Sequence, residues 1–355
     1  MRTKRILLIL TGGTICSFAT SRGEQAPDTK RAEALIIQKF RESNSPYKSE
    51  ECVCFDAVAP LDVLSENMTT LHWNVLIDAL RSYDFSAYDG VIMLHGTDTL
   101  AYSAAMLSIV LSGLSVPLIL VSSQLTLANP MANGVANFCA AVELILNGIK
   151  PNVYVTYRNE ERIGNTFAQT MYVHYAAHLT QCAGRSNNFY SDDMTVISQE
   201  NAHFIGVKSP GETSLLEDAN FGGFTASVLR IEPYAGVDYS KFSLDGVSAV
   251  VHGAYHSGTA ATNPHVAGGD CSRYSILHLK EMCDRQNPPI PLFMEPCDRT
   301  VYQSTGDALR GGILPICSMT SEMAYVKCLI GCSMGLSGDA LYEYIQSNKN
   351  NEHLY

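Results

Sequence analysis

The chain lacks several features that identify common classes of protein. It has no block of Lys or Arg residues and its formal net charge is −11, so nucleic acid and anionic membrane surfaces are poor partners. Its longest apolar runs fall short of the roughly 18 to 20 residues that a membrane helix needs. We therefore expect a protein that binds neither nucleic acid nor membrane.

Cysteine pairing signals and a secretion signal are also missing. The eleven cysteines lack framework spacing, and Cys52-x-Cys54 is not the CxxC pair of redox or zinc sites. The basic start MRTKR precedes an apolar run, as in a signal peptide, but that run is brief and ends in glycines rather than a cleavage site. We interpret the run as a first strand, and expect reduced thiols in a cytoplasmic protein.

The stretch Ile6–Thr14, with the sequence ILLILTGGT, lacks the marks of a nucleotide site. It contains no GxGxxG, and no Lys follows the glycines as in a Walker A loop. Its unbroken apolar run is typical of a strand buried on both faces of a parallel sheet. Gly12 and Gly13 permit a sharp turn, and Thr11 and Thr14 would stand at the carboxyl end of the strand, where open α/β sheets bind ligands. The stretch predicts either a hydroxyl-bearing site or a plain turn.

Strand, polar strand end and helix recur along the first half of the chain. This order is typical of a doubly wound α/β domain with a mostly parallel sheet. Residues 16–31, rich in Ser, Thr, Arg and Gly, predict a mobile loop or a plain connection. Strands are predicted at 6–10, 52–58, 90–95, 116–121 and 153–157, and helices at 32–40, 71–83 (capped by Thr69 or Thr70), 100–111 and 133–146.

The length predicts two domains, since a domain averages roughly 150 residues. Residues 206–222 contain Pro, several Gly and mixed charges, and predict a linker between an N-terminal catalytic domain (1–205) and a C-terminal domain (223–355). The second domain repeats the α/β pattern on a smaller scale. Its strands are predicted at 226–231, 246–252 and 290–294, and its helices at 274–283, 322–330 and 339–346.

A second hydroxyl-bearing turn, Gly96-Thr97-Asp98-Thr99, follows the strand at 90–95. In a doubly wound sheet this turn and TGGT at 11–14 could open into one cleft. A threonine hydroxyl has a very high pKa, so as a nucleophile it needs a base and an oxyanion site. Asp98 could orient a water molecule or bind an ammonium group, but it is equally suited to cap the helix that begins at residue 100.

The two turns together resemble a known family. TGGTI near the N-terminus and HGTDT after a buried strand, about eighty residues apart, are similar to the two signature motifs of the bacterial-type L-asparaginase/glutaminase family. The resemblance covers nearly the whole chain. Residues 65–69 (SENMT) look like the family's substrate loop, and VLRIEPYAGVD at 228–238 resembles the start of its smaller C-terminal domain. The missing signal peptide fits the cytoplasmic type I branch.

The resemblance implies a mechanism without metal or cofactor. The family hydrolyses the side-chain amide of asparagine or glutamine in two steps. By motif match, Thr14 would be the nucleophile that forms the acyl-enzyme, and Thr97 and Asp98 would belong to the group that handles water. Ser65 and Glu66 would hold the α-carboxylate and α-ammonium, since Asp98 and Glu66 supply carboxylates for the cationic end of the substrate.

The same resemblance implies roles for two glycines and an assembly. Gly13 and Gly96, one in each motif, would line the substrate site. The family builds its site between two subunits, so a homodimer or a homotetramer is expected, with a small amino acid as the substrate.

The chain departs from the family's pattern at the expected site. A tyrosine on the loop after TGGT helps to activate the nucleophile in the family, but residues 16–31 contain none, and Tyr47 is the nearest downstream. In our alignment Gln181 stands where the family has a lysine, and neither Lys150 nor Lys208 is a natural substitute. A neutral Gln cannot lower the pKa of a neighbouring hydroxyl as an ammonium does.

Other side chains leave alternatives open. In the family an Asp follows a serine-glutamine turn, which Ser122-Ser123-Gln124 resembles here. Asn133 stands in place of that Asp. His174 and His178, four residues apart, could face one way on a helix and suggest zinc, although no third ligand is apparent. His256, beside a glycine turn, could be a substituted acid–base group or an ordinary loop histidine.

Three functions are therefore considered. The first is an amidohydrolase acting on asparagine, glutamine or a related amide. The second is the amide-releasing subunit of a tRNA-dependent amidotransferase, which usually carries an extra N-terminal domain, whereas Met1 here starts almost directly on the first strand. The third is a catalytically weak or silent relative that binds an amino acid or a partner.

Overall fold

The computed structural model describes residues 2–184, 186–197, 214–267, 269–297 and 302–354. The chain forms two compact units. The first comprises residues 1–218 together with 349–351, and the second comprises 219–348 together with 352–355. Part of the predicted linker, residues 206–213, lies outside the described residues.

The first unit is built on a seven-stranded sheet with the order β4-β1-β5-β6-β7-β8-β9. The prediction of a doubly wound, mostly parallel sheet is confirmed. Because the chain runs from β1 to β4 on one side and then to β5 on the other, the topological switch point lies between β1 and β5. The parallel strands are β1 (Lys4–Leu10), β4 (Val53–Val58), β5 (Gly90–Leu94), β6 (Leu118–Val121) and β7 (Val153–Ile163), and β8 (Thr166–Tyr175) and β9 (Thr195–Val196) pair antiparallel.

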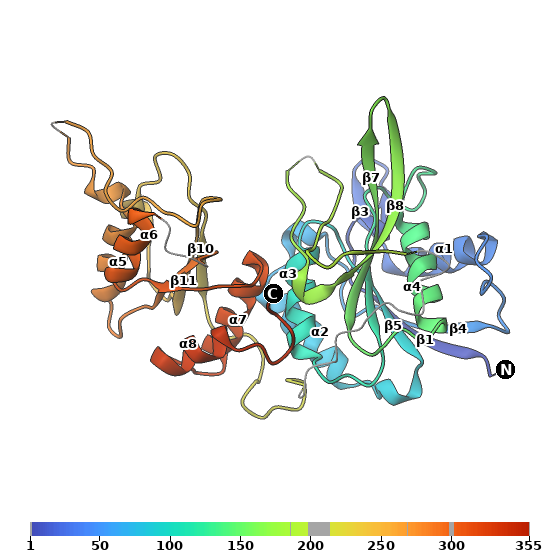
Figure 1. Ribbon diagram of the computed structural model, residues 1–355. Coiled ribbons are helices and arrows are strands. Elements are labelled where there is room, and N and C mark those ends of the chain that lie inside the picture. The colour runs from blue at the N-terminus through green and yellow to red at the C-terminus, as the bar shows by residue number, and fades with distance from the viewer. Residues whose placement is uncertain (1, 185, 198–213, 268, 298–301, 355) are drawn as a thin grey trace. The chain divides into compact units, whose positions relative to one another are not determined.

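Helices cover both faces of this sheet (Figure 1). On one face, α1 (Thr29–Glu42) packs against α4 (Gly134–Leu146), and the rings of Phe40 and Phe138 meet edge to face at 5.7 Å. On the other face lie α2 (Thr70–Arg81) and α3 (Leu100–Val110), where the Trp73 indole donates to Ser103 Oγ at 3.0 Å. The apolar run of β1 is consequently buried on both sides.

The helices begin at residues suited to capping. The Asp28 carboxylate accepts a hydrogen bond from Arg31 N and starts α1 earlier than its apolar pattern indicates. Thr69 caps α2 and forms a capping box with His72, which confirms the predicted cap.

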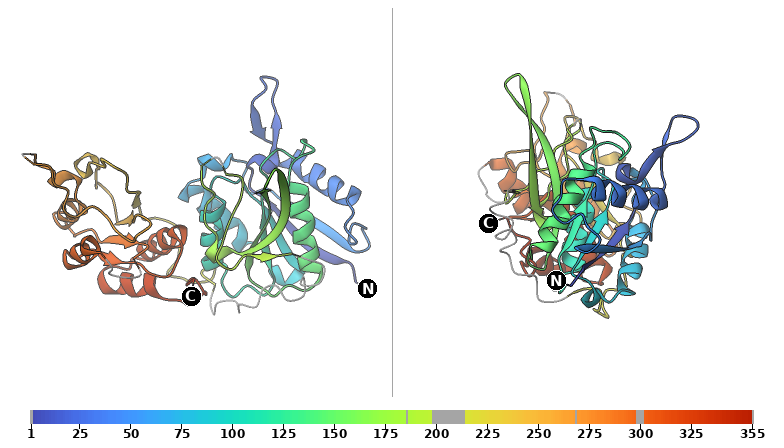
Figure 2. Two further views of the ribbon diagram at one scale, coloured as in Figure 1. Left: turned by 45° about the horizontal axis from the view of Figure 1, so that its top comes forward. Right: turned by 90° about the vertical axis from the view of Figure 1, so that its right-hand side faces the viewer.

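Several strands of the first unit were not predicted. β8 and β9 were missed, and residues 16–31 contain a short hairpin of β2 (Ser17–Ala19) and β3 (Gln25–Pro27) rather than only a loop. β7 runs past its predicted end because it pairs with β8 in a long hairpin that extends beyond the rest of the sheet (Figure 1, Figure 2). The residues of that extension are largely polar and exposed, so they lack the apolar run that marks a buried strand.

The second unit is a smaller α/β domain, as predicted. Its four strands are parallel in the order β10-β11-β12-β13. α6 was missed because its sequence, QSTGDALR, is mostly polar, although Thr305, Gly306 and Ala308 are buried. The strands are β10 (Val228–Ile231), β11 (Ala249–Gly253), β12 (Leu292–Glu295) and β13 (Leu314–Pro315), and the helices are α5 (Ile276–Asp284), α6 (Gln303–Arg310), α7 (Ser321–Ser333) and α8 (Gly338–Gln346).

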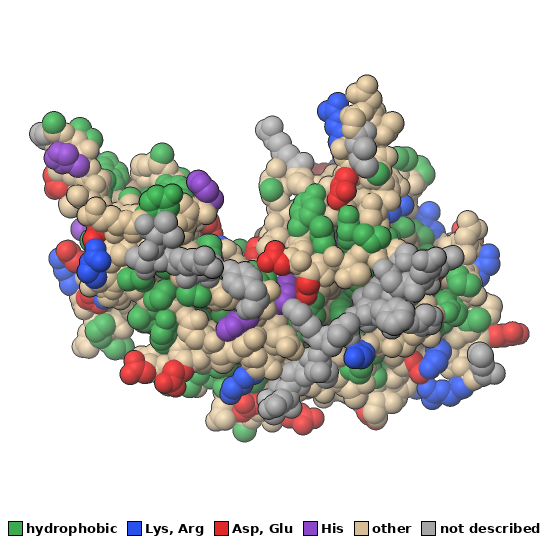
Figure 3. All heavy atoms as spheres, in the orientation of Figure 1, with side chains coloured by type: hydrophobic (Ala, Val, Ile, Leu, Met, Phe, Trp, Pro, Cys, Tyr) green, Lys and Arg blue, Asp and Glu red, His purple; other side chains and the backbone are tan. Residues whose placement is uncertain are grey.

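Two surface properties bear on possible partners. On the face drawn in Figure 3, Lys and Arg side chains occur in small separate groups rather than in one continuous patch. None of the helices in the described part of the chain combines the length and the apolar character that crossing a membrane requires.

Candidate functional site

Three loops converge at the carboxyl ends of β1 and β5, beside the switch point of the first sheet. A Cβ on Gly13 would lie 2.2 Å from the Cα of Gly96, and a Cβ on Gly96 would lie 2.4 Å from the Cβ of Ser65. Gly13 also has φ 74°, which favours glycine. The TGGT and HGTDT turns are therefore in backbone contact, and the loop carrying Ser65 packs against the second of them.

Thr14 begins a short 3₁₀ turn, Thr14–Cys16, with Gly13 as its N-cap. Ser17, which follows this turn, donates a hydrogen bond from its hydroxyl to Gly13 O at 2.8 Å and so joins the two ends of the turn. Thr14 is half-buried, and its hydroxyl makes no hydrogen bond with any described residue. The hydroxyl is therefore open to a ligand, but among the described residues no base is hydrogen-bonded to it, and a threonine nucleophile needs one.

Asp98 is held by Ser65. Ser65 Oγ accepts a hydrogen bond from Asp98 N at 3.1 Å and donates one to Asp98 Oδ2 at 3.3 Å. The interpretation of Asp98 as a helix cap is wrong, because the N-cap residue of α3 is Thr99 and no side chain caps that helix end. Asp98 is exposed and Thr97 is half-buried, so both remain accessible to a ligand.

Glu66 is the second predicted carboxylate of the substrate site. It follows Ser65 in the 3₁₀ turn Ser65–Asn67 and is exposed. Its carboxylate forms no ion pair with the described residues. It is therefore available to an ammonium group, as is Asp98, but no hydrogen bond joins the two carboxylates directly.

Gln181 lies beside the Thr97 turn. Its Nε2 donates to Thr97 O at 2.8 Å, and its Oε1 accepts from Ala101 N at 3.1 Å. The side-chain amide thus satisfies the backbone at the start of α3, rather than contacting the Thr97 hydroxyl. Within the described ranges, no lysine is hydrogen-bonded to Thr97.

The other candidates for the missing tyrosine and lysine do not lie near Thr14. The Tyr47 hydroxyl bonds the side-chain oxygen of Asn147, the C-cap residue of α4, which places Tyr47 at the amino-terminal edge of the parallel strands. Lys150 precedes β7 at that same edge. Lys208 lies outside the described residues.

The paired histidines do not share a helix face. His174 is on β8 with its Nδ1 3.0 Å from Ser191 Oγ, and burial lowers the pKa of His174 to about 4. His178 closes a 3₁₀ turn, with Nδ1 3.0 Å from Asp193 Oδ2 and Nε2 2.8 Å from Asn351 O. The helical interpretation is wrong because the chain is extended at His174. Across the described residues, no three His, Cys, Asp or Glu side chains gather as metal ligands.

His256 and Asn133 have simpler positions. His256 is exposed in the loop after β11, in the second unit. Asn133 is buried, and its amide accepts from Gln124 N and donates to Arg158 O, each at 3.0 Å. It therefore ties the turn after β6 to β7.

One residue of the site was missed from the sequence. His95 is buried, and its Nδ1 lies 2.8 Å from Gly96 O. Because a carbonyl can only accept, Nδ1 carries the proton, and burial lowers the pKa of His95 so that the ring is neutral. The sequence offered one indication that His95 belongs to the site, namely that it is the first residue of the HGTDT motif.

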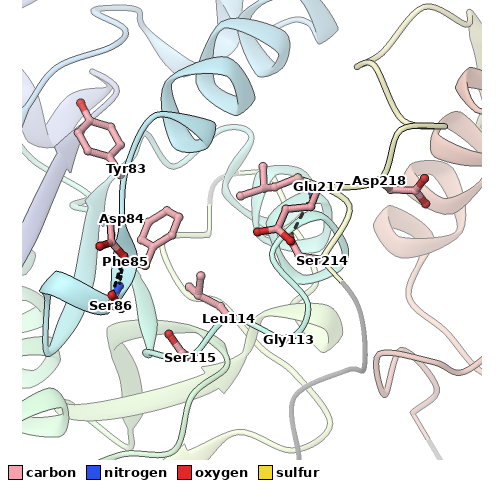
Figure 4. A pocket seen from close by; sticks show the side chains of 11 residues that line it. Tyr83, Asp84, Phe85, Ser86, Gly113, Leu114, Ser115, Ser214, Glu217 and Asp218 are labelled. Carbon is pink, nitrogen blue, oxygen red and sulfur yellow. Dashed lines mark hydrogen bonds between the residues drawn. The ribbon is translucent and has the colours of Figure 1, made fainter.

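The first unit also has a hollow of ≈ 800 Å³ at its opposite edge (Figure 4). Its walls come from residues 83–86, 113–115, 214 and 216–218. The first two groups lie in the loops that lead into β5 and β6, so the hollow is at the amino ends of those strands. The motif hydroxyls do not line it, and we do not assign the chemistry to it.

Comparison with known proteins agrees with the two motifs. The family model "Asparaginase, N-terminal" matches residues 5–202. L-asparaginase 1 of Escherichia coli (strain K12) is 31% identical over 362 residues, which cover 99% of this chain and 98% of that protein. A glutamyl-tRNA(Gln) amidotransferase subunit of Methanococcus maripaludis is 24% identical over 339 residues, 92% of this chain and 76% of that protein.

The fold is shared with solved structures. The structure of L-asparaginase I from Vibrio cholerae O1 biovar eltor superposes with a TM-score of 0.71 at 21% identity, covering 99% of both chains. The family match over more than half of the chain and the full-length Escherichia coli relative establish the assignment. The chain belongs to the asparaginase family of amidohydrolases.

Proposed function

We propose that this amidohydrolase cleaves the side-chain amide of L-asparagine, or of L-glutamine or a related compound, to the acid and ammonia through an acyl-enzyme on Thr14. The observation that carries the proposal is the contact of Gly13 with Gly96, which brings the Thr14 and Thr97 turns together. Both hydroxyls are partly accessible and hydrogen-bonded to none of the described residues.

The surrounding side chains suit the ammonium group of an amino-acid substrate. Asp98 and Glu66 are exposed carboxylates on adjoining loops and would receive the α-ammonium group. The Ser65 hydroxyl orients Asp98 by bonding both its N–H and its carboxylate, and we place it with Gly13 and Gly96 in the substrate-binding wall. Thr97 would act with Asp98 on the water that releases the acid.

The rate is expected to be modest at neutral pH. Gln181 bonds the backbone of Thr97 and brings no positive charge to its hydroxyl. A hydroxyl without a neighbouring cation is harder to deprotonate. Activity should therefore rise toward alkaline pH.

Assembly and location are part of the proposal. The family's tendency to build its site between two subunits leads us to propose a homodimer or a homotetramer in the cytoplasm. Sedimentation at micromolar concentration tests the assembly, and a monomer would contradict it.

The proposed function is tested by ammonia release from purified protein supplied with asparagine, glutamine or simple amides. Wild type should release ammonia, Thr14→Ala should not, and Thr14→Ser should keep part of the activity because it retains a hydroxyl. Activity of Thr14→Ala within tenfold of wild type would move the nucleophile elsewhere. Ammonia release that requires a partner and Glu-tRNA would instead favour an amidotransferase subunit, and none under any condition would favour a silent relative.

A further inference from the structure

Three buried polar side chains at the carboxyl edge of the first sheet lack hydrogen-bond partners among the described residues. They are His95 through Nε2, Ser122 through Oγ and Tyr157 through its hydroxyl, and each is 0% exposed. The Asn133 amide approaches the Tyr157 hydroxyl, but its effect on the pKa of Tyr157 is smaller than that of burial, and the two groups do not form a hydrogen bond. Buried polar groups are normally satisfied, so three such exceptions in one region call for an explanation.

The three side chains form one row across three neighbouring strands. Leu94 pairs with Val121, and Val121 with Thr156, so the next residue on each strand is His95, Ser122 or Tyr157. His95 N donates to Val121 O at 3.0 Å, which continues the ladder to this level. Side chains alternate along a strand, so this row faces the same side of the sheet as the paired residues Met93, Leu120 and Val155. We call these three residues the polar row.

The polar row adjoins the turn that carries Thr97 and Asp98. At one end, His95 bonds Gly96 O directly. At the other end lies Cys182, which follows Gln181. Burial chiefly raises the pKa of the Cys182 thiol, and the nearby Asp98 carboxylate adds to this effect. Cys182 is also close enough to Tyr157 to raise the pKa of its hydroxyl, although burial is the main cause. The row therefore lies behind the HGTDT turn.

The chemistry of the polar row fits water. His95 Nε2 is a bare acceptor because Nδ1 holds the proton, whereas the two hydroxyls can both donate and accept. Each of these atoms needs a hydrogen-bond partner that the described residues do not supply, and a buried water molecule, which makes two to four hydrogen bonds, is the usual partner of such groups. A metal ion is disfavoured because the row has no carboxylate or thiolate, and an ammonium ion is disfavoured because a buried cation without a counter-ion is costly.

We propose that the polar row binds ordered water molecules between His95, Ser122 and Tyr157. The water on Nε2 fixes the ring, and the ring fixes the Gly96 carbonyl and with it the Thr97 turn, which makes His95 a positioning residue. The positioning role of His95 rests on the proposed function, whereas the binding of water does not.

Two matched pairs of variants test the binding of water by the sign of a stability change. Tyr157→Phe and Ser122→Ala remove hydroxyls without a protein partner, and their controls Tyr154→Phe and Ser123→Ala remove hydroxyls that bond Lys150 O and Leu125 O. If waters are bound, all four variants lower the melting temperature. If the row is dry, Tyr157→Phe and Ser122→Ala raise it, because they delete unsatisfied groups, and the proposal is overturned.

A crystal structure and kinetics complete the test. Electron density should show water within hydrogen-bond distance of Nε2 and of both hydroxyls, and a direct His95–Ser122 bond with no water would overturn the proposal. Ser122→Ala should lower kcat several-fold and leave KM within twofold. An unchanged kcat together with a lowered melting temperature would contradict the positioning role. Wild type without any amidase activity would defeat the proposed function, while the stability and crystallographic results would still decide the binding of water.

Discussion

The parallel strands of both sheets end in polar side chains, but those side chains differ in their hydrogen bonding. At the carboxyl edge of the first sheet, Thr14 and Thr97 are half-buried, and their hydroxyls are hydrogen-bonded to none of the described residues. At the same edge of the second sheet, Glu295 ends β12 with its side chain 1% exposed. It accepts a hydrogen bond from Ser321 Oγ at 2.8 Å and lies 3.2 Å from Arg230 Nη2.

The difference separates a reactive edge from a structural one. Burial raises the pKa of Glu295 to about 7 despite the opposing effect of Arg230, and its carboxyl group is almost fully buried against Ser321 and Arg230. The first edge instead keeps its hydroxyls uncommitted and uses glycines to bring two turns into contact. The parallel sheet is common to both units, and the residues that follow its strands decide the chemistry.

The largest effect in this comparison is expected from Thr97→Ala. If Thr97 belongs to the group that handles water, its loss should lower kcat about a thousandfold, or about 4 kcal/mol of transition-state stabilisation. Thr99→Ala is the control, because that hydroxyl donates to Ser65 O at 3.2 Å and is expected to matter less than tenfold. Steady-state ammonia release measures kcat of both variants. Equal losses of kcat in Thr97→Ala and Thr99→Ala would refute a catalytic role that belongs to Thr97 alone.

The contact between the turns is tested by Gly96→Ala. The new Cβ would lie 2.4 Å from Ser65 Cβ and Oγ, so the loops must separate at a cost of about 3 kcal/mol, and activity should fall with stability. Gly184→Ala meets nothing within 4 Å and should change the unfolding free energy by less than about 0.5 kcal/mol. Urea unfolding compares the two, and a Gly96→Ala protein as stable as the control would deny that the contact is tight.

The structural edge is tested by the pH dependence of stability. The folded-state pKa of Glu295 is raised from 4.5 to about 7, so its contribution to the free energy of unfolding is fully present below about pH 4.5 and is lost as the pH rises through about 7. The change is about 3 kcal/mol. Glu295→Gln, which cannot ionise, should flatten that part of the urea-unfolding profile, and an unchanged slope would show that another group titrates there.

The smallest effect is expected from Gln181→Lys. The ammonium group can donate to Thr97 O, as Gln181 does, and adds a positive charge beside Thr97, so activity at neutral pH should rise. Ala101 N loses its acceptor, which should lower stability by about 1 kcal/mol. Gln169→Lys on the exposed part of β8 is the matched control and should change neither quantity. A fall in activity with Gln181→Lys would mean that the family's use of lysine does not carry over.

Uninterrupted apolar runs made the buried strands predictable. β1, β5 and β6 lie where such runs occur, and their positions fixed where TGGT and HGTDT stand in the fold. The extended β7–β8 hairpin and α6 were missed because their sequences are polar and do not indicate a buried face. Tertiary contact, rather than local pattern, determines these elements.

The candidate site was predictable only in part. The motifs identify Thr14, Thr97 and Asp98, but not that Ser65 rather than a helix end holds Asp98. The polar row could not be predicted, since it depends on which strands are neighbours and in what register. Nor does the sequence show that Tyr47 lies at the opposite edge of the sheet.

Thr14 is the residue on which we expect the acyl-enzyme to form. The most direct test is rapid-quench mass spectrometry of wild type and Thr97→Ala mixed with L-asparagine, followed by mapping of any acylated peptide. We predict an ester on the peptide that contains Thr14, which accumulates in Thr97→Ala because its breakdown by water is slowed. Ammonia release accompanied by acylation of another residue, or by no covalent intermediate in either protein, would contradict the claim.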